Sequence, residues 1–330
     1  MKLEFLNVNQ GDSILITWPE HPNKCGIIDC SLENGNPVLN SVKTLGISEI
    51  EFIILSHPHI DHFSGINELL KYCKLSGIQI NNLGLTFDTL VSISYLKFYS
   101  YPNQLLLKEF FEEVLDQSRK PKTSYLKNIF SISKDTAPIQ VNNLTITFRS
   151  PLLAETMKIS RSLSKLVNGD IVSPPNLNVY STVIELKYNE KFILLTSDAI
   201  LSYFKKLNNF YNLNPSIKFE LVQIPHHGSN KNYLPKFWQE LNVISDCPAV
   251  FSIGDEPKDE LPDYDVVSNV DSLNFKIHST NYVYGLKDYF GGKPVKKSPT
   301  PVILSSVSKL VKTTYHGLSP NLSGTQAFLF

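Results

Sequence analysis

The sequence lacks the features that would assign it to several specialised classes of protein. It has only four cysteines in 330 residues. They are scattered without C-x-x-C spacing, so we expect reduced, buried thiols instead of a disulfide framework. No stretch approaches the ~20 consecutive apolar residues of a membrane-spanning helix, and the N-terminus has no apolar run long enough for a signal peptide. We therefore expect a cytoplasmic protein without membrane contact.

The chain also has no net charge at pH 7. The 31 basic and 31 acidic residues balance, so the chain as a whole has no electrostatic attraction to nucleic acid or to a membrane surface. Long duplex DNA, which favours a basic groove, is therefore disfavoured as a partner. The sequence contains no G-x-x-x-x-G-K-[ST] phosphate loop. Its hydrophobic content of 42% is that of a globular chain able to bury a sizeable core.

Histidine is scarce, which makes its distribution informative. Three of the eight histidines, His57, His59 and His62, lie with Asp61 in the stretch LSHPHIDHFSGI. This stretch follows IEFIILS, a continuous apolar run that predicts a buried central strand. Alternate residues of an extended segment point the same way, so the first two histidines can bind one metal ion. Asp61 and His62, past the bend, can bind a second ion, and the position after a strand favours this reading over a histidine-rich surface turn.

Three further polar clusters also follow apolar strands: Asp29 in GIIDC, Asp198 in ILLTSD, and His226-His227 in VQIPHH. The ends of central strands are where rigid elements direct side chains into a common site. Imidazole and carboxylate ligands suit zinc, manganese or iron. We predict two divalent ions, Zn or Mn, bridged by Asp198 through its two carboxylate oxygens, with a water activated between them as the nucleophile.

Roles for the remaining residues are less sharply defined by the sequence, which does not decide which of His226 and His227 binds an ion. We take His226 as the ligand, and His227 with Asp61 as catalytic groups. Residues expected to hold the ligands in place are Asp12, Asp29 and Ser229. For Asp12 the alternative is a turn aspartate that holds backbone amides. Histidines outside these motifs are expected to be structural or on the surface: His21, His278 and His316.

The periodicity predicts an α+β protein. Strand-rich halves with helices between them indicate a four-layer αββα sandwich instead of a doubly wound sheet. Residues 1–265 are expected to form the main domain, with a helical insertion at about 87–135 that covers one side of the core. Residues 266–330 are expected to form a β-rich C-terminal extension packed on it. Ser64 is expected to cap a helix that Gly77 ends.

Taken together, these motifs resemble those of the metallo-β-lactamase-fold hydrolases. LSHPHIDHFSGI matches the main metal motif of that superfamily, LLTSDA its bridging aspartate, and IIDC its first aspartate. More narrowly, NQGDSILI, LLTSDA and IPHHGSN are similar to the hydrolase domain of the competence DNA-uptake membrane proteins. The resemblance covers about residues 1–75 and 140–260. It implies a metal-dependent phosphodiesterase or nuclease.

The chain departs from that resemblance in two places. The superfamily supplies a third histidine to the first ion from the region before the bridging aspartate, but this chain has no histidine between His62 and His226. Water, Asn178 or Asp170 are the candidates to complete the first ion, which is then expected to bind less tightly. The competence branch often carries Gly-His-Pro where this chain has DELPDYDVV, which weakens any simple transfer of substrate.

Three functions are compatible with these residues. The first is hydrolysis of phosphodiesters in nucleic acid or nucleotides, preferably short, single-stranded or cyclic. The second is hydrolysis of a carbonyl substrate such as a lactone, thioester or β-lactam. The third is a non-catalytic partner-binding module with a degenerate site. The C-terminal extension is the expected contact for a protein partner or a second copy. Aromatic residues of the insertion either stack on bases or belong to the core: Tyr95, Phe98, Tyr99 and Tyr101.

Overall fold

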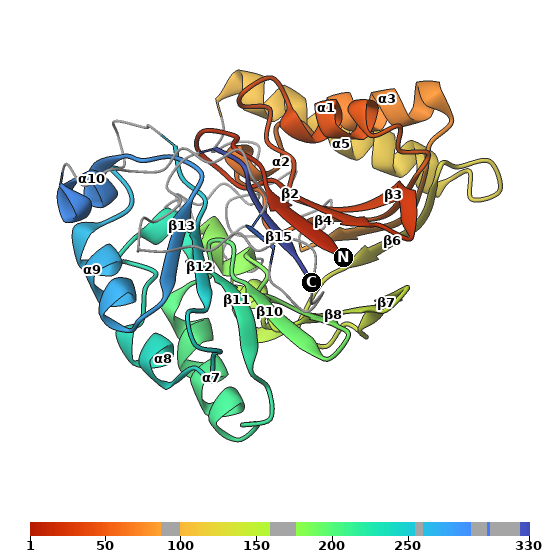
Figure 1. The fold of residues 1–330 in the computed structure, drawn as a ribbon. Helices are drawn as coiled ribbons and strands as arrows, with labels where there is room; N and C mark the ends of the chain where they lie inside the picture. The colour runs from red at the N-terminus through yellow and green to blue at the C-terminus, as the bar shows by residue number, and fades with distance from the viewer. Residues whose placement is uncertain (87–99, 159–175, 255–259, 292–301, 304–323) are drawn as a thin grey trace.

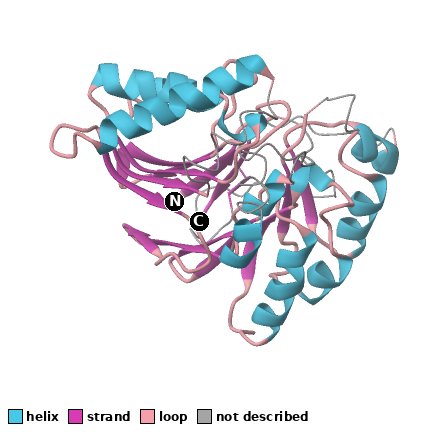
Figure 2. Cartoon of the chain, turned by 180° about the vertical axis from the view of Figure 1, so that it is seen from behind, coloured by secondary structure: helices cyan, strands magenta, loops and turns pink. Residues whose placement is uncertain are grey.

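The computed structural model describes residues 1–86, 100–158, 176–254, 260–291, 302–303 and 324–330. Their strands form two sheets that pack face to face, and helices cover the outer face of each sheet (Figure 1). Figure 2 shows the same layers from behind, with the helices outside and the strands inside. The predicted four-layer αββα sandwich is confirmed.

The first sheet has eight strands among the described residues, in the order β14-β15-β1-β2-β3-β4-β5-β6. The strands from β3 to β6 run parallel to one another. In chain order the strands are β1 (Lys2–Phe5), β2 (Ile14–Trp18), β3 (His21–Ile28), β4 (Glu49–Leu55), β5 (Gln79–Leu85), β6 (Leu126–Ser131), β14 (Val302–Ile303) and β15 (Gln326–Leu329).

Helices from the first half of the chain cover the outer face of this sheet (Figure 1). A short helix that carries part of the histidine-rich stretch lies at the end of β4. Proline at the start of the first helix removes an N–H that would have no partner there. The helices are α1 (Pro37–Thr44), α2 (Ile60–Phe63), α3 (Ile66–Ser76) and α5 (Tyr101–Ser118).

Local predictions in this half are partly wrong. Gly65, and not Ser64, is the N-cap residue of α3, because Ser64 ends α2 and its hydroxyl accepts the backbone N–H of Leu32. Gly77 does end α3, with a φ of 68° that is readily adopted by glycine. Within the predicted helical insertion, residues 126–131 form β6, because they pair with β5 and extend the sheet.

The second sheet has seven strands among the described residues, in the order β13-β12-β11-β10-β9-β8-β7. In chain order the strands are β7 (Ile139–Val141), β8 (Leu144–Phe148), β9 (Ile184–Tyr188), β10 (Lys191–Leu195), β11 (Phe219–Gln223), β12 (Pro248–Phe251) and β13 (Lys276–Ser279). The helices over its outer face are α7 (Leu201–Asn212), α8 (Pro235–Glu240), α9 (Tyr264–Ser272) and α10 (Tyr284–Phe290).

Alternation along the central strands explains the layers. Phe52 of β4 faces the second sheet, whereas the next residue, Ile53, faces the helices. In the same way, Leu221 of β11 joins the core between the sheets, and Val222 joins the core under α7 to α10. Both faces of these strands are apolar, as expected of parallel strands covered on two sides. Burial of each such side chain contributes about 1.5–3 kcal/mol to the free energy of unfolding.

The described C-terminal residues lie in both sheets. β13 pairs with β12, and β15 pairs with β1, so that Met1 and Phe330 exchange backbone hydrogen bonds. The predicted boundary at residue 265 falls inside α9, and the division into two domains remains a prediction. Among the described residues, no helix is both long and apolar enough to cross a membrane.

Candidate metal centre

The predicted metal-binding residues meet at one edge of the sandwich, because they follow parallel strands of both sheets. Asp29 follows β3 and His57 lies two residues after β4, and these strands are parallel. Asp198 follows β10 and His226 follows β11, which are also parallel. Since the carboxyl ends of parallel strands lie at the same edge of a sheet, the two sheets bring four loops together there.

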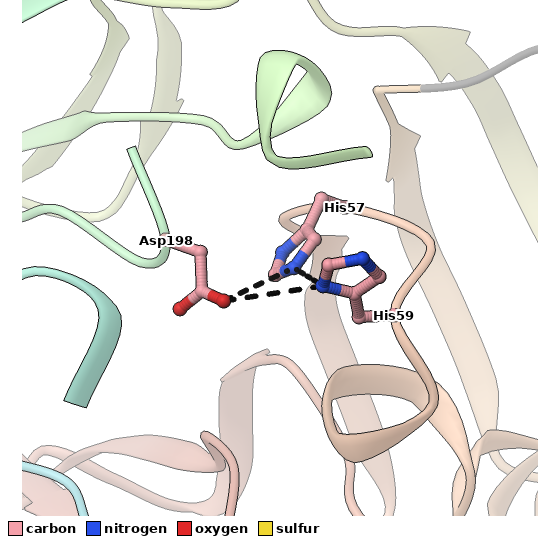
Figure 3. Close-up of side chains that lie close together, drawn as sticks. All are labelled: His57, His59 and Asp198. Atoms are coloured by element: carbon pink, nitrogen blue, oxygen red, sulfur yellow. Dashed lines mark hydrogen bonds and ion pairs between the residues drawn. The ribbon is translucent and has the colours of Figure 1, made fainter. Parts of the chain in front are cut away.

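One group of side chains surrounds oxygen Oδ2 of Asp198. Figure 3 shows that His57 and His59 point toward this carboxylate and toward each other. His57 Nε2 lies 3.5 Å from Asp198 Oδ2, His59 Nδ1 lies 4.0 Å from it, and the two ring nitrogens are 3.0 Å apart. His226 Nε2 lies 3.4 Å from the same oxygen. This set is called the first group below.

A second group surrounds the other oxygen of Asp198. His62 Nε2 and His227 Nε2 lie 3.6 Å and 3.7 Å from Asp198 Oδ1. Asp61 Oδ2 lies 3.7 Å from the ring nitrogen of His62 and 3.5 Å from that of His227. The structure therefore places Asp198 between the two groups, one carboxylate oxygen facing each.

Buried polar atoms without partners show that cations fit this site. His62 Nε2, His227 Nε2 and Asp198 Oδ1 are buried and have no hydrogen-bond partner within the described chain. Leaving a buried polar atom unpaired costs about 1–3 kcal/mol. Three such atoms converge on one point, and each can donate a lone pair to a metal ion, so a divalent ion would satisfy all three at once.

The far side of each ring is held so that the near nitrogen is free to bind. The Nδ1–H of His62 donates to Asp29 Oδ2 at 2.8 Å, and Asp29 also accepts the backbone N–H and the hydroxyl of Ser56 at 2.7 Å and 2.6 Å. The Nδ1–H of His227 donates to the carbonyl oxygen of Ser252 at 2.6 Å. A fixed Nδ1–H leaves the lone pair on Nε2, which is the form that binds a metal.

Asp12 contacts the site through a residue that the sequence did not single out. Gln223 Nε2 donates to Asp12 Oδ2 at 2.8 Å, while its Oε1 accepts the backbone N–H groups of Thr196 and Ser197, next to Asp198. Asp12 Oδ2 also lies 3.8 Å from His62 Nδ1. Gln223 is the last residue of β11, so its position at a strand end is the signal that could have identified it.

The pKa values follow from burial and from the charges within the site. Burial lowers the pKa of His57 to about 3, and the nearby charge of His62 acts in the same direction. Burial would also lower the pKa of His227, but Asp198 and Asp61 raise it to about 9. Burial would raise the pKa of Asp198, yet the neighbouring histidines hold it well below its ordinary value. A metal ion bound at His227 Nε2 would therefore compete with a proton at neutral pH.

Of the other residues named from the sequence, some lie beside His226 and others lie away from the two groups. Asn178 Nδ2 is 3.5 Å from His226 Nε2, and the buried Ser229 donates its backbone N–H to the carbonyl oxygen of His226. His278 is buried 5.2 Å from the ring of Phe328, away from the two groups. His21 begins β3. Residues that lie outside the described ranges are Tyr95, Phe98, Tyr99, Asp170 and His316; the side chain of Tyr101 is also not described.

A cleft of about 790 Å³ opens over the two groups, with Asp198, Asp61 and His226 among its lining residues. Amide, acidic and apolar side chains make up much of the rest. Lys231 is the one lysine or arginine that lines it within the described ranges, and two further acidic residues lie there, Glu33 and Asp263. The cleft therefore brings little positive charge to a substrate apart from that of bound ions.

Comparison with protein-family models agrees with the fold. A family model described as the metallo-beta-lactamase superfamily matches residues 6–237. No curated protein matches the chain. The metallo-beta-lactamase fold protein YhfI from Bacillus subtilis is 12% identical over 86% of this chain and 98% of its own, with a TM-score of 0.47. Zn²⁺-bound PqqB from Methylobacterium extorquens is 9% identical over 84% of this chain and 97% of its own, with a TM-score of 0.45. Sequence identities and TM-scores this low say nothing about the function of this chain.

Proposed function

Because this chain belongs to the metallo-beta-lactamase superfamily of metal-dependent hydrolases, we propose that it is a phosphodiesterase that uses two divalent ions bridged by Asp198. The single observation that carries the proposal is the position of that carboxylate, with one oxygen facing each group of histidines. Two ions a few ångströms apart polarise a phosphoryl oxygen and lower the pKa of a bound water.

Each ion is assigned its own set of protein ligands. The first ion would be held by His57, His59 and His226, and the second by Asp61, His62 and His227, with Asp198 available to both. For His227 this replaces the predicted catalytic role, because its side chain is only 3% exposed and its Nε2 faces Asp61 and Asp198. We therefore propose both histidines of the pair as ligands, one for each ion.

Asp61 is the group proposed to orient the attacking water. Its side chain is 26% exposed and lines the cleft, whereas that of Asp198 is only 2% exposed. Its contacts with His62 and His227 keep it ionised, since they hold its pKa below the ordinary value in spite of burial. An ionised carboxylate at the mouth of the site can orient an attacking water by accepting a hydrogen bond from it.

The cleft and the sequence motifs together support a small phosphodiester as the substrate. The motifs NQGDSILI and IPHHGSN, similar to those of the competence-protein hydrolase domain, support phosphodiester chemistry. A long polyanionic strand would need a basic path, but Glu33 and Asp263 lie beside Lys231 in the described lining. We therefore propose a short single-stranded or cyclic nucleotide substrate, or another compact phosphodiester, in preference to duplex DNA.

A substrate panel tests the proposal directly. The purified chain, loaded with Zn²⁺ or Mn²⁺, is assayed on matched phosphodiesters, lactones, thioesters and β-lactams, together with His59→Ala and Asp61→Ala. We expect turnover of phosphodiesters that both substitutions reduce by at least a hundredfold. His21→Ala, at the start of β3 and away from the site, is the matched control and should keep its activity. Turnover confined to the carbonyl substrates would reject the proposal.

A further inference from the structure

We propose that Asn232 is a positioning residue that fixes His226 as the third imidazole of the first ion site. His226 would thereby take the place of the histidine that this sequence lacks between His62 and His226. The inference rests on the two-ion site proposed above, but it does not depend on which substrate that site hydrolyses. It would mean that the first ion has as many protein ligands as the second.

The orientation of the Asn232 amide is determined by its partners. Its side chain is buried, with 6% exposure, and Nδ2 donates to the carbonyl oxygens of Asp198 and Ala199 at 3.1 Å and 3.0 Å. Carbonyl oxygens only accept hydrogen bonds, so the amide cannot be turned the other way round. The amide oxygen must then be the atom that faces His226.

This orientation fixes the tautomer of His226. Asn232 Oδ1 lies 2.8 Å from His226 Nδ1, and an amide oxygen can only accept, so Nδ1 carries the hydrogen. The lone pair of the neutral ring is then on Nε2, the nitrogen that lies 3.4 Å from Asp198 Oδ2. One asparagine thus connects the ring of His226 to the backbone of the residue that bridges the two ions.

The separations around Asp198 Oδ2 are close to those expected for a shared ion. Ligand atoms at ~2.1 Å from a tetrahedral ion lie about 3.4 Å from one another. The separations from Asp198 Oδ2 are 3.4 Å for His226 Nε2, 3.5 Å for His57 Nε2 and 4.0 Å for His59 Nδ1. Asn178, one of the candidates named from the sequence, presents Nδ2 to His226 Nε2 at 3.5 Å, while its Oδ1 is buried without a hydrogen-bond partner in the described residues, so Asn178→Ala is the competing test.

The backbone separates the two adjacent histidines. His226 and His227 both have left-handed φ angles, 47° and 56°, which is unusual for residues other than glycine. As a result the first ring faces Asp198 Oδ2 and the second faces Oδ1. Strained backbone of this kind is maintained at functional sites when the surroundings hold it in place. Asn232 and the hydrogen bond from His226 N–H to the carbonyl oxygen of Ser197 supply part of that hold.

Metal titration of the full chain tests this assignment. Zn²⁺ affinities for the two sites are measured by competition with a chromophoric chelator, and Co²⁺ spectra report the ligands of each ion. We expect Asn232→Ala to weaken one of the two ions by about 10–100-fold and to leave the other unchanged. His226→Ala should weaken the same ion more strongly, and Asp61→Ala the other one. Asn230→Ala, two residues away at an exposed position, is the matched control.

Several outcomes would overturn the inference. It fails if Asn232→Ala weakens both ions equally or neither, or if Asn178→Ala abolishes the first site while His226→Ala does not. Should Asn232→Ala not fold, ¹⁵N NMR of the histidine rings in the unaltered chain decides the matter. There we expect His226 to keep its hydrogen on Nδ1 and to bind Zn²⁺ through Nε2; zinc on Nδ1 would contradict it. Two bound ions without phosphodiester turnover would reject the proposed function alone.

Discussion

At the scale of single residues, the carboxylate of Asp198 stands out because its two oxygens face different sets of side chains. His57, His59 and His226 lie around one oxygen, and His62 and His227 lie around the other. The loop that carries it is strained, since Ser197 has a φ of 43°. The interactions that maintain this loop are therefore as much a part of the site as the ligands.

Asp29 offers a test of how much a residue that is not a proposed ligand contributes to metal affinity. Asp29→Asn should fold, because the left-handed φ of 58° at this position suits asparagine. The change removes the negative charge that holds the Nδ1–H of His62. We expect the second ion to bind about 10–100-fold more weakly, measured by chelator competition. Asp135→Asn, at an exposed carboxylate, is the control, and equal affinities in the two variants would contradict the prediction.

We expect the buried His278 to cause part of the pH dependence of the unfolding free energy. Burial lowers its pKa to about 3, with Lys276 acting in the same direction, so the ring is neutral in the folded chain and gains a proton on unfolding below pH ~6.5. Its contribution to stability is present above that pH and is lost as the pH falls toward 3. The loss should approach 1.4 kcal/mol per pH unit, flattening near pH 3.

The measurement is the urea unfolding free energy between pH 7 and 4 for the unaltered chain and for His278→Leu. We expect a shallower pH slope in the variant by about one proton. The same slope in both proteins would show that His278 does not carry this dependence.

At the scale of elements, the β1–β2 connection packs closely against α2, the helix that carries two of the proposed ligands. A Cβ atom on Gly11 would overlap the backbone carbonyl of Asp61 in α2, and the φ of this glycine is 114°. Gly35 also has a positive φ, 72°, but a Cβ there would meet nothing within 4 Å. Substitution of either glycine would strain the backbone, but only substitution of Gly11 would also displace α2. Comparing the two variants therefore distinguishes the two effects.

We expect Gly11→Ala to weaken the second ion and to lower Tm, since the clash displaces Asp61 and His62 together. Gly35→Ala should lose at most about 1–2 kcal/mol of unfolding free energy and keep both ions. Chelator competition and thermal unfolding of the two variants provide the comparison. If both variants bound the two ions with the same affinity, close contact at Gly11 would have no part in positioning α2.

Some strands and site residues could be predicted from the sequence, and others could not. β4 could be predicted because IEFIILS is apolar on both faces, and the histidines could be located because they are scarce and follow a strand. The assignment of His226 and His227 to different groups could not be predicted, since it depends on two successive left-handed residues that are not glycine. The contacts of Gln223 and Asn232 were also missed, because they arise only when separate loops pack together.

At the scale of the whole molecule, the candidate centre joins the two halves of the sandwich. His57 and His62 come from the first sheet, and Asp198 and His227 come from the second. Ions bound there would therefore stabilise the packing of one sheet on the other, by about 2.7 kcal/mol for an ion supplied at a hundred times its Kd. We expect a strong chelator to lower Tm by several degrees and Zn²⁺ to restore it.

Asp198→Ala is the control for this prediction, since it removes the ligand proposed to be shared by both ions while leaving the histidines in place. Its Tm should not respond to the chelator. Equal melting temperatures of the loaded and chelated unaltered chain would show that the ions do not stabilise the contact between the sheets.

The separation of the ligands in the chain has a consequence for how the protein folds. Neither half holds a complete set, because both groups need Asp198 from the second sheet and histidines from the first. Such contacts form late, after the intervening chain has closed into a loop. Zn²⁺ present from the start should leave the refolding rate unchanged and slow unfolding, because binding stabilises the native state but not the transition state. Uptake of metal would then mark the moment when the two sheets have come together.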